Sequence, residues 1–154
     1  MSKLLIASDH AGFDLKEKLR IYLEKKGMGV KDLGTYSKDR CDYPLYAYEL
    51  AKNISHGKFK RGILICKSGI GNSIVANRLP GVRAALCHNV KITKLSREHN
   101  DSNILVLGSA FVSLDLAKKM IAVWLKTQFL GGRHLKRVKL IDDCGCVPVS
   151  TPRA

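Results

Sequence analysis

Acidic residues are scarce in this sequence: 13 Asp and Glu stand against 27 Lys and Arg, which gives a formal net charge of +14. An excess of this size favours anionic partners. There is no run of five or more like charges, which argues against a nucleic-acid-binding tail. A small phosphorylated ligand therefore explains the excess positive charge better than a nucleic acid does. Most individual lysines are accounted for by a generally basic, solvated surface.

Long hydrophobic runs are also missing. The apolar stretch near the N-terminus, Leu4 to Ala7, ends at Ser8-Asp9. It is too short for the hydrophobic part of a signal peptide or for a membrane span. We therefore expect a cytoplasmic protein without membrane association.

The cysteine count argues against a disulfide framework. Five cysteines are an odd number, and without a secretion signal they are expected to be reduced thiols. Cys144 and Cys146 form a lone pair, because no second Cys or His pair stands at metal-ligand spacing. Two tail thiols are a simpler interpretation of this pair than zinc ligands, and we expect no metal site.

The composition is that of an ordinary globular protein. With 154 residues, 45% hydrophobic and 26% charged, the chain fits one folded domain. We expect this domain to cover residues 1–142. Residues 143–154 contain Pro148 and Pro152 and are expected to form a partly mobile tail.

Short β-like apolar runs alternate with amphipathic segments along the whole chain. This alternation predicts a single-domain, doubly wound αβα sandwich of the Rossmann-like α/β class, with a five-stranded parallel sheet between two helical layers. The predicted strands are 3–7, 29–33, 62–65, 82–86 and 104–107. The predicted helices are 13–26, 44–54, 71–77, 113–127 and 133–141.

Polar clusters stand near the ends of three predicted strands. In open parallel sheets, ligands bind beyond the carboxyl ends of the strands. The first strand is followed by Ser8-Asp9-His10 and the third by the segment 66–71, while Arg97-Glu98-His99-Asn100-Asp101 comes shortly before the fifth. We predict that the three clusters lie at one edge of the sheet, although a single His or Asp in a loop is more often a cap or a surface group.

The segment from Cys66 to Gly71 is the most informative of the three. Small residues between a strand and a helix let several backbone N–H groups converge on an anion. The segment matches neither the Walker pattern nor the dinucleotide fingerprint, so nucleoside triphosphates and NAD lose support. The helix dipole next to Cys66 favours the thiolate, which would act as nucleophile or base. The alternative is a buried structural cysteine.

Two arginines stand four residues apart in the last predicted helix. Arg133 and Arg137 therefore share one helix face, from which both guanidinium groups can reach one phosphate. This pattern favours recognition of a phosphate monoester. A solvated basic face is the alternative, because such pairs are common on helices.

Five motifs in order resemble the type B ribose-5-phosphate isomerase family. They are Ala7-Ser8-Asp9-His10-Ala11-Gly12, Cys41-Asp42-Tyr43-Pro44, the segment 66–71, Arg97-Glu98-His99-Asn100-Asp101 and Gly131-Gly132-Arg133-His134. The match is collinear from Lys3 to about Ile141. The resemblance implies an aldose–ketose isomerase that interconverts ribose 5-phosphate and ribulose 5-phosphate through an enediolate, without metal or organic cofactor.

The resemblance also implies a role for each site residue. Cys66 matches the catalytic base, and His99 matches the proton donor in ring opening, with Asp9 nearby. The phosphate ligands of the family are matched by His10, Arg133 and Arg137. Its sugar contacts are matched by Tyr43, Ser68 and Asn100, and Ser68 is also counted as catalytic. Its anion hole is matched by the backbone of Lys67, Ser68, Gly69, Ile70 and Gly71.

Three positions depart from the family pattern. Ser68 stands where Thr is commoner, which keeps the hydroxyl group and should matter little. Lys67 stands where the family usually has Gly, and Ala110 stands where many relatives supply a further arginine to the phosphate. We hypothesise that Lys67 partly replaces this arginine, lowering the pKa of Cys66 and attracting the phosphate. The alternative is that Lys67 points into solvent and contributes only its backbone N–H.

The resemblance further implies a homodimer or homotetramer whose site is shared between two chains, with His99, Asn100, Arg133 and Arg137 supplied by the partner chain. Two alternatives stay open. One is a related isomerase acting on galactose 6-phosphate or allose 6-phosphate. The other is a non-catalytic module that binds phosphate or nucleic acid, which would leave Cys66 and His99 without a function. We expect a sugar-phosphate substrate and no nucleic-acid partner.

Overall fold

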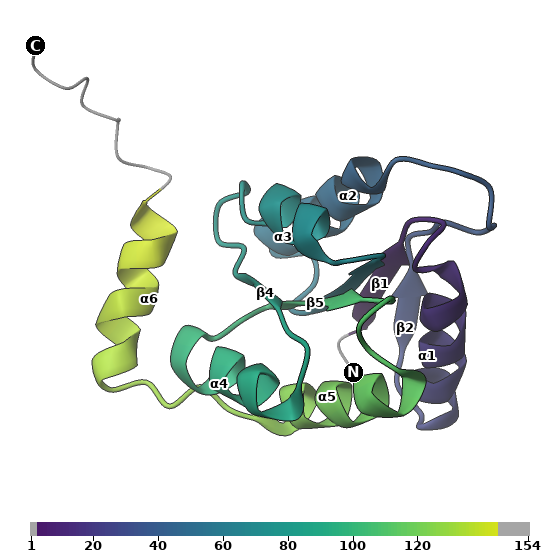
Figure 1. Cartoon of the computed structure of the whole chain (residues 1–154). Coiled ribbons are helices and arrows are strands. Elements are labelled where there is room, and N and C mark those ends of the chain that lie inside the picture. Colours follow the sequence, from purple (N-terminus) through teal and green to yellow (C-terminus); the bar gives the residue numbers. More distant parts are fainter. Residues whose placement is uncertain (1–2, 145–154) are drawn as a thin grey trace, which may run out of the picture.

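The computed structural model describes residues 3–144, and Figure 1 shows its layers. Five parallel strands form one sheet in the order β2-β1-β3-β5-β4. The strands are β1 (Leu4–Ser8), β2 (Val30–Asp32), β3 (Gly62–Cys66), β4 (Ala84–Leu86) and β5 (Ile104–Gly108). The helices are α1 (Phe13–Lys25), α2 (Tyr43–Ser55), α3 (Ile70–Ala76), α4 (Val90–Asn100), α5 (Leu114–Lys126) and α6 (Arg133–Asp143). The predicted α/β fold is confirmed, whereas most of the predicted tail lies outside the described residues.

Helices cover both faces of the sheet, which explains why its central strands are apolar along their length. β1, β3 and β5 are buried at every position, as parallel strands between two helical layers must be. Ile63 and Ile65 pack on the side of α1 and α5, and Leu64 packs on the side of α2. Helix α6 lies outside these layers, against α4 (Figure 1). Within residues 3–144 no helix is long and apolar enough to cross a membrane.

Helix α4 is missing from the elements predicted from the sequence, which placed nothing between the fourth and fifth strands. Its buried face is polar: Thr93, Ser96 and Arg97 point inward, where an amphipathic helix normally has apolar side chains. Asn89 caps the helix by accepting a hydrogen bond from the Ile92 N–H at 2.9 Å. The apolar period that reveals the other helices is therefore absent here.

Hydrogen bonds take the place of apolar packing on this polar face. The indole N–H of Trp124 in α5 donates to Ser102 Oγ at 2.9 Å, and Ser102 Oγ lies 2.9 Å from Ser96 Oγ. Arg97 Nη1 donates to the Ser102 carbonyl at 2.6 Å. Because these buried groups have partners, the network fixes the end of α4 against α5 and the start of β5.

A buried ion pair joins α1 to the end of β2. The side chain of Lys16 is fully buried, and its Nζ contacts the carboxylates of Asp32 and, at 2.8 Å, of Glu17. Hydrogen bonds from Arg20 and from Lys16 lower the pKa of Glu17 to about 2. Asp32 also accepts the Gly34 N–H at 2.8 Å, so the pair anchors the loop that leads to α2.

Lys16→Met is expected to lower the free energy of unfolding by about 3 kcal/mol, because it leaves the Asp32 carboxylate without its buried partner. Lys18→Met is the matched control: Lys18 is exposed on the same helix, and its loss should change stability by less than about 0.5 kcal/mol. Urea unfolding of the two variants and the parent measures the difference. Equal stabilities of the two variants would show that the buried pair contributes nothing.

Candidate active site

The carboxyl ends of β3 and β5 support a polar site around Cys66. Cys66 is the last residue of β3 and is 4% exposed. Its carbonyl accepts the Ser109 N–H at 2.8 Å, and the carbonyl of Lys67 accepts the Ala110 N–H at 3.0 Å. These two bonds extend the contact between the strands past their ends and hold the loop that follows Cys66.

The loop 67–71 brings backbone N–H groups close to the sulfur. The Gly69 N–H donates to Cys66 Sγ at 3.1 Å, and the Ile70 N–H donates to Ser68 Oγ at 3.2 Å. Gly69 has a φ of +80°, and a Cβ atom there would lie 2.5 Å from Leu86 Cδ1. Only glycine fits this turn, so the short contact between the loop backbone and Cys66 depends on it.

Burial raises the pKa of the Cys66 thiol, and the negative charge of Asp9 acts in the same direction. The backbone N–H groups of Gly69, Asn72 and Ser68 stabilise the thiolate but do not outweigh burial. The expectation that the helix N-terminus makes the thiolate the favoured form is therefore wrong. Loss of hydration in a nearly closed site is the larger effect, and it keeps free Cys66 mostly protonated near neutral pH.

Asp9 and His10 follow β1 at the same edge of the sheet. Asp9 is buried, and its Oδ1 accepts the Gly12 N–H at 3.0 Å. The Cys41 N–H donates to His10 Nδ1 at 3.2 Å. His10 Nδ1 also lies 3.2 Å from the Cys41 carbonyl oxygen, so this nitrogen finds a partner in Cys41 whether or not it carries a proton, and Nε2 is the ring nitrogen left for an anion.

Tyr43 closes one side of this edge. It is the first residue of α2, and its ring packs directly on Gly71, where a Cβ atom would lie 2.3 Å from Tyr43 Cζ. The Lys67 side chain is exposed and makes no ion pair with any residue in 3–144. The structure thus brings together one group of the site residues predicted from the sequence, namely Asp9, His10, Tyr43, Cys66, Lys67, Ser68, Gly69, Ile70 and Gly71.

His99 and Asn100 lie at the opposite edge of the sheet. Helix α4 carries the chain from the carboxyl end of β4 back to the amino end of β5, and the Asn100 carbonyl accepts a hydrogen bond from Arg83, directly before β4. Five residues of strand separate the two edges by roughly 16 Å. The prediction that all three clusters share one edge is therefore wrong for residues 97–101, because the unpredicted helix α4 reverses the chain.

A second cluster forms at that edge between α4 and α6. The rings of His99 and His134 stack with their centroids 4.2 Å apart and their planes 10° apart. Burial lowers the pKa of His134, and the charges of His99, Arg133 and Arg137 lower it further. Both arginines are exposed and make no ion pair within residues 3–144, so the cluster presents uncompensated positive charge to solvent.

His134 stands in one of the five motifs but received no role from the sequence. His134 and Val138 are the two buried residues of α6, and they mark the face of the helix that packs toward α4. Their spacing of four residues is the sequence signal that could have shown that His134 points inward. Among residues 3–144 no three His, Cys, Asp or Glu side chains are placed to hold a metal ion.

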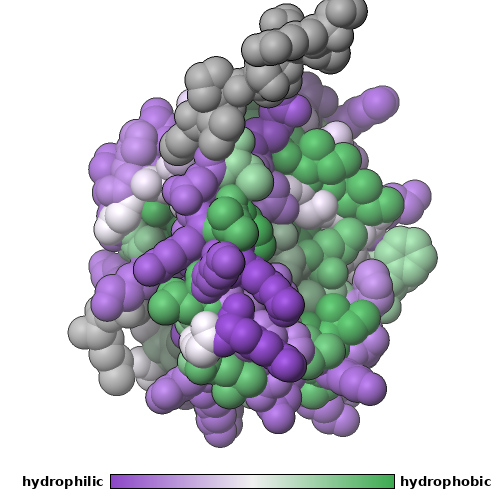
Figure 2. All heavy atoms as spheres, turned by 90° about the vertical axis from the view of Figure 1, so that its left-hand side faces the viewer, coloured by the Kyte–Doolittle hydropathy of each residue, from purple (hydrophilic) through white to green (hydrophobic). Residues whose placement is uncertain are grey.

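Exposed apolar side chains lie on α3 and α6. Ile70 and Ile74 are 56% and 59% exposed, and Leu135 and Leu140 are 45% and 56% exposed. Figure 2 shows hydrophobic groups set among hydrophilic ones on the face of the molecule that carries α6. Large apolar side chains left exposed on two helices in this way are expected where a second chain covers them.

Comparisons with known proteins bear on this geometry. The family described as Ribose/Galactose Isomerase matches residues 4–141. Ribose-5-phosphate isomerase B of Escherichia coli (strain K12) is 45% identical over 141 residues, which cover 92% of this chain and 95% of that protein. A ribose 5-phosphate isomerase structure from Thermotoga maritima has a TM-score of 0.90 at 46% identity and covers 92% and 98% of the two chains. Ribose-5-phosphate isomerase B from Mycoplasma genitalium, solved with bound ribulose-5-phosphate, has a TM-score of 0.87 at 38% identity and covers 91% and 93%.

Proposed function

The chain belongs to the ribose/galactose isomerase family of sugar-phosphate isomerases, and we propose that it interconverts ribose 5-phosphate and ribulose 5-phosphate with Cys66 as the base. The observation that carries the proposal is the hydrogen bond from the Gly69 N–H to Cys66 Sγ, which places the sulfur beside the loop backbone. An enediolate reaction requires a base and an anion-binding group at one point, and this contact supplies both.

The proposed reaction moves one proton between neighbouring carbons. The Cys66 thiolate takes the proton from C2 of the open-chain aldose; the C–H electrons form the C1–C2 double bond, and the carbonyl oxygen on C1 becomes an oxyanion. Backbone N–H groups of the loop 67–71 would stabilise this oxyanion, by about 3 kcal/mol per donor. Transfer of the O2 proton to O1 and return of the proton from Cys66 to C1 give the ketose and regenerate the thiolate.

A raised thiol pKa suits this role. A proton on carbon next to a carbonyl is only weakly acidic, and a thiolate in a buried site is a stronger base than one in water. Burial also keeps the Cys66 thiolate a minor species near neutral pH. The rate is therefore expected to rise with pH until the thiol is fully ionised.

Ring opening comes before the proton transfer, because ribose 5-phosphate is mainly a closed ring. We assign the donation of a proton to the ring oxygen to His99, with Asp9 near the sugar. Within one chain His99 and Cys66 lie at opposite edges of the sheet and cannot act on the same sugar. The proposed site is therefore completed by a second copy of the chain.

This second copy would supply His99, Asn100, Arg133 and Arg137 to the edge that holds Cys66. Two observations support the proposal: the arginines have no carboxylate partner among residues 3–144, and exposed apolar side chains lie on α3 and α6. The phosphate would be held by both arginines and by His10 of the first copy. The assembly is then a homodimer, or a homotetramer built from such dimers.

Two of the departures from the family pattern, at positions 67 and 110, affect this phosphate site. Ala110 supplies no cation, and its N–H is bonded to the Lys67 carbonyl, while the Lys67 side chain is exposed near the site. Partial replacement of the missing arginine by Lys67 stays a prediction. We further propose that the enzyme acts in the cytoplasm, in pentose phosphate metabolism, without a cofactor.

Cys66→Ala is expected to lower the rate of ketose formation from ribose 5-phosphate by at least about 100-fold, because only a base at the position of Cys66 can take the proton from the sugar carbon. The variant should also lose the exchange of a C1 proton of ribulose 5-phosphate with D2O, measured by NMR. Allose 6-phosphate and galactose 6-phosphate serve as comparison substrates. If the parent converted none of these sugar phosphates, the isomerase function would be wrong.

His99→Ala provides the contrast for this experiment. Ribulose 5-phosphate has no ring to open, so the His99 variant should keep the C1 exchange while it loses turnover of ribose 5-phosphate. Exchange that persists in Cys66→Ala would exclude Cys66 as the base, whereas equal loss of exchange in both variants would remove the ring-opening role of His99.

Mixing two inactive variants tests the shared site. In a hybrid of Cys66→Ala and Arg133→Ala chains, one of the two sites combines the intact Cys66 of one copy with the intact Arg133 of the other. Random exchange at equal amounts should restore about a quarter of the parental activity. Cys66→Ala mixed with Asp9→Ala is the control, because both changes affect the same strand-end half and no hybrid site is intact. Absence of rescue in the first mixture would place the whole site within one chain.

A further inference from the structure

Arg83, directly before β4, connects the ends of α4 and α6. Its Nε donates to the carbonyls of Asn100 and Asp101, both at 3.1 Å. Its Nη1 lies 2.9 Å from each carboxylate oxygen of Asp142, in the last turn of α6. The Arg83 side chain is 14% exposed, whereas the side chains of Asp101 and Asp142 are 35% and 37% exposed, so the guanidinium group is largely covered and its carboxylate partners are partly open to water. One guanidinium group thus holds two helices that both carry site residues.

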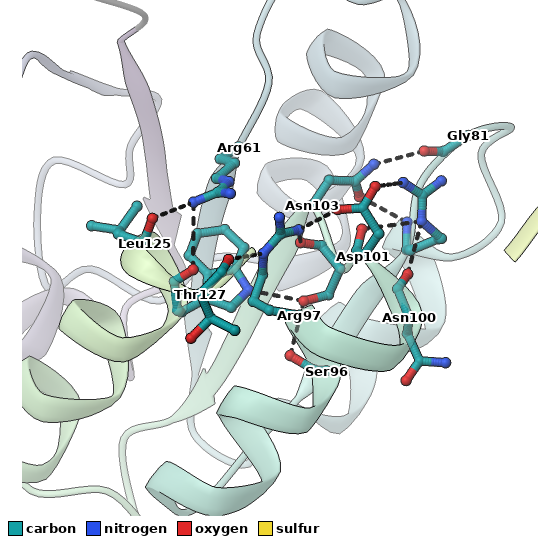
Figure 3. A network of polar contacts seen from close by, with 12 residues as sticks. Arg61, Gly81, Ser96, Arg97, Asn100, Asp101, Asn103, Leu125 and Thr127 are labelled. Carbon is teal, nitrogen blue, oxygen red and sulfur yellow. Dashed lines mark hydrogen bonds and ion pairs between the residues drawn. The ribbon is translucent and has the colours of Figure 1, made fainter. Parts of the chain in front are cut away.

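The turn at the end of α4 is held from two sides. Asp101 has a φ of +47°, in the left-handed region that few residues other than glycine adopt. Its carboxylate pairs with Arg97 Nη1 at 2.7 Å and with Arg83 Nη2 at 3.3 Å. Figure 3 shows Arg97 and Asp101 facing each other beside Asn103 at the start of β5. His99 lies two residues before Asp101. The two arginines that hold the turn, Arg83 and Arg97, therefore also fix the position of His99.

Helix α6 is attached near both of its ends. Near its start His134 stacks on His99, and near its end Asp142 pairs with Arg83. These two attachments are about 12 Å apart along the helix axis. The exposed arginines that would bind the phosphate lie on this same helix. The buried Val138 lies between the two attachments, so without the contact at Asp142 only the first half of α6 would be held, and the helix could tilt and carry the arginines with it.

We propose that Arg83 is a positioning residue of the isomerase site, which sets the distance between His99 and the phosphate-binding pair Arg133 and Arg137. The inference rests on the proposed function and concerns the same site. His99 has to reach the sugar ring while the arginines hold the phosphate at the other end of one molecule, so their spacing has to match the substrate. A misplacement of about 1 Å can lower the rate by roughly 100-fold.

The shape of the arginine side chain is essential to this role. Its planar guanidinium binds both carboxylate oxygens of Asp142 while Nε faces the helix carbonyls, whereas lysine offers a single flexible charge. Arg83 bonds to Asn100, Asp101 and Asp142 and to neither Cys66 nor the loop 67–71, and in the proposed site the Cys66 that takes the proton belongs to the other copy. Changes at Arg83 should therefore alter substrate placement and leave the proton transfer itself intact.

The test compares Arg83→Lys and Asp142→Asn with the parent and with Arg61→Lys. Arg61 is the matched control, because it lies at the same edge but its Nη1 donates to the Leu125 carbonyl of α5 at 2.9 Å. Both test variants should lower kcat/KM for ribose 5-phosphate about 10-fold or more. The rate of C1 exchange at saturating ribulose 5-phosphate should stay within about twofold of the parent. Arg61→Lys should keep parental values for both.

Two further readouts separate positioning from a general loss of stability. The double variant should be no worse than Arg83→Lys alone, because both changes remove the same contact. The ring signals of His134 in the NMR spectrum, which the stacked His99 ring shifts, should move in both test variants and not in Arg61→Lys. Parental kinetics in the test variants, or equal losses in Arg61→Lys, would overturn the inference. If the parent itself did not convert ribose 5-phosphate, the proposed function would fail, and the His134 signals would still decide whether Arg83 holds α6.

Discussion

In a parallel sheet all strands end at one edge, and each connecting helix returns the chain to the other. This constraint divides the site residues into two groups. Asp9 and Cys66 lie at the carboxyl ends of strands, whereas His99 lies at the end of α4, near the amino ends of the strands. No rotation of side chains brings the groups together, because the length of β3 lies between them. The proposed two-chain site follows from this separation, and it gives the exposed arginines and the apolar surface of α3 and α6 a common purpose.

Burial favours the neutral form of two groups, Cys66 in the strand-end half of the proposed site and His134 in the half formed by α4 and α6. It raises the pKa of the Cys66 thiol and lowers the pKa of His134, since loss of hydration penalises the charged form of either sign. Positive charge is instead left on the exposed Arg133 and Arg137. In the proposed reaction, the phosphate dianion is bound at the surface, and Cys66 takes the carbon-bound proton as a base whose strength depends on its burial. Arg83 links α4 and α6, the helices that carry His99 and the two arginines.

Apolar periodicity made most of the fold predictable. The buried runs of β1, β3 and β5 gave strands within one or two residues, and the five motifs in order gave the family, which the match over residues 4–141 confirms. Helix α4 escaped because Ser96 and Arg97 on its buried face are stabilised by Ser102 and Trp124, partners that no local pattern reveals. The placement of His99 failed for the same reason. The direction of the Cys66 pKa depends on packing around the strand end, which the sequence of the loop does not contain.

Cys66 can act as the base only when it is ionised, so its titration and the pH dependence of catalysis must coincide. The ultraviolet absorbance of the thiolate, taken as the difference between the parent and Cys66→Ser, titrates this single thiol. The kcat/KM for ribose 5-phosphate over the same pH range reports the free enzyme. We predict that both rise together with one midpoint above the ordinary cysteine pKa of about 8.5, because burial raises the pKa of this thiol. A kcat/KM that stays level while Cys66 ionises would contradict its role as the base.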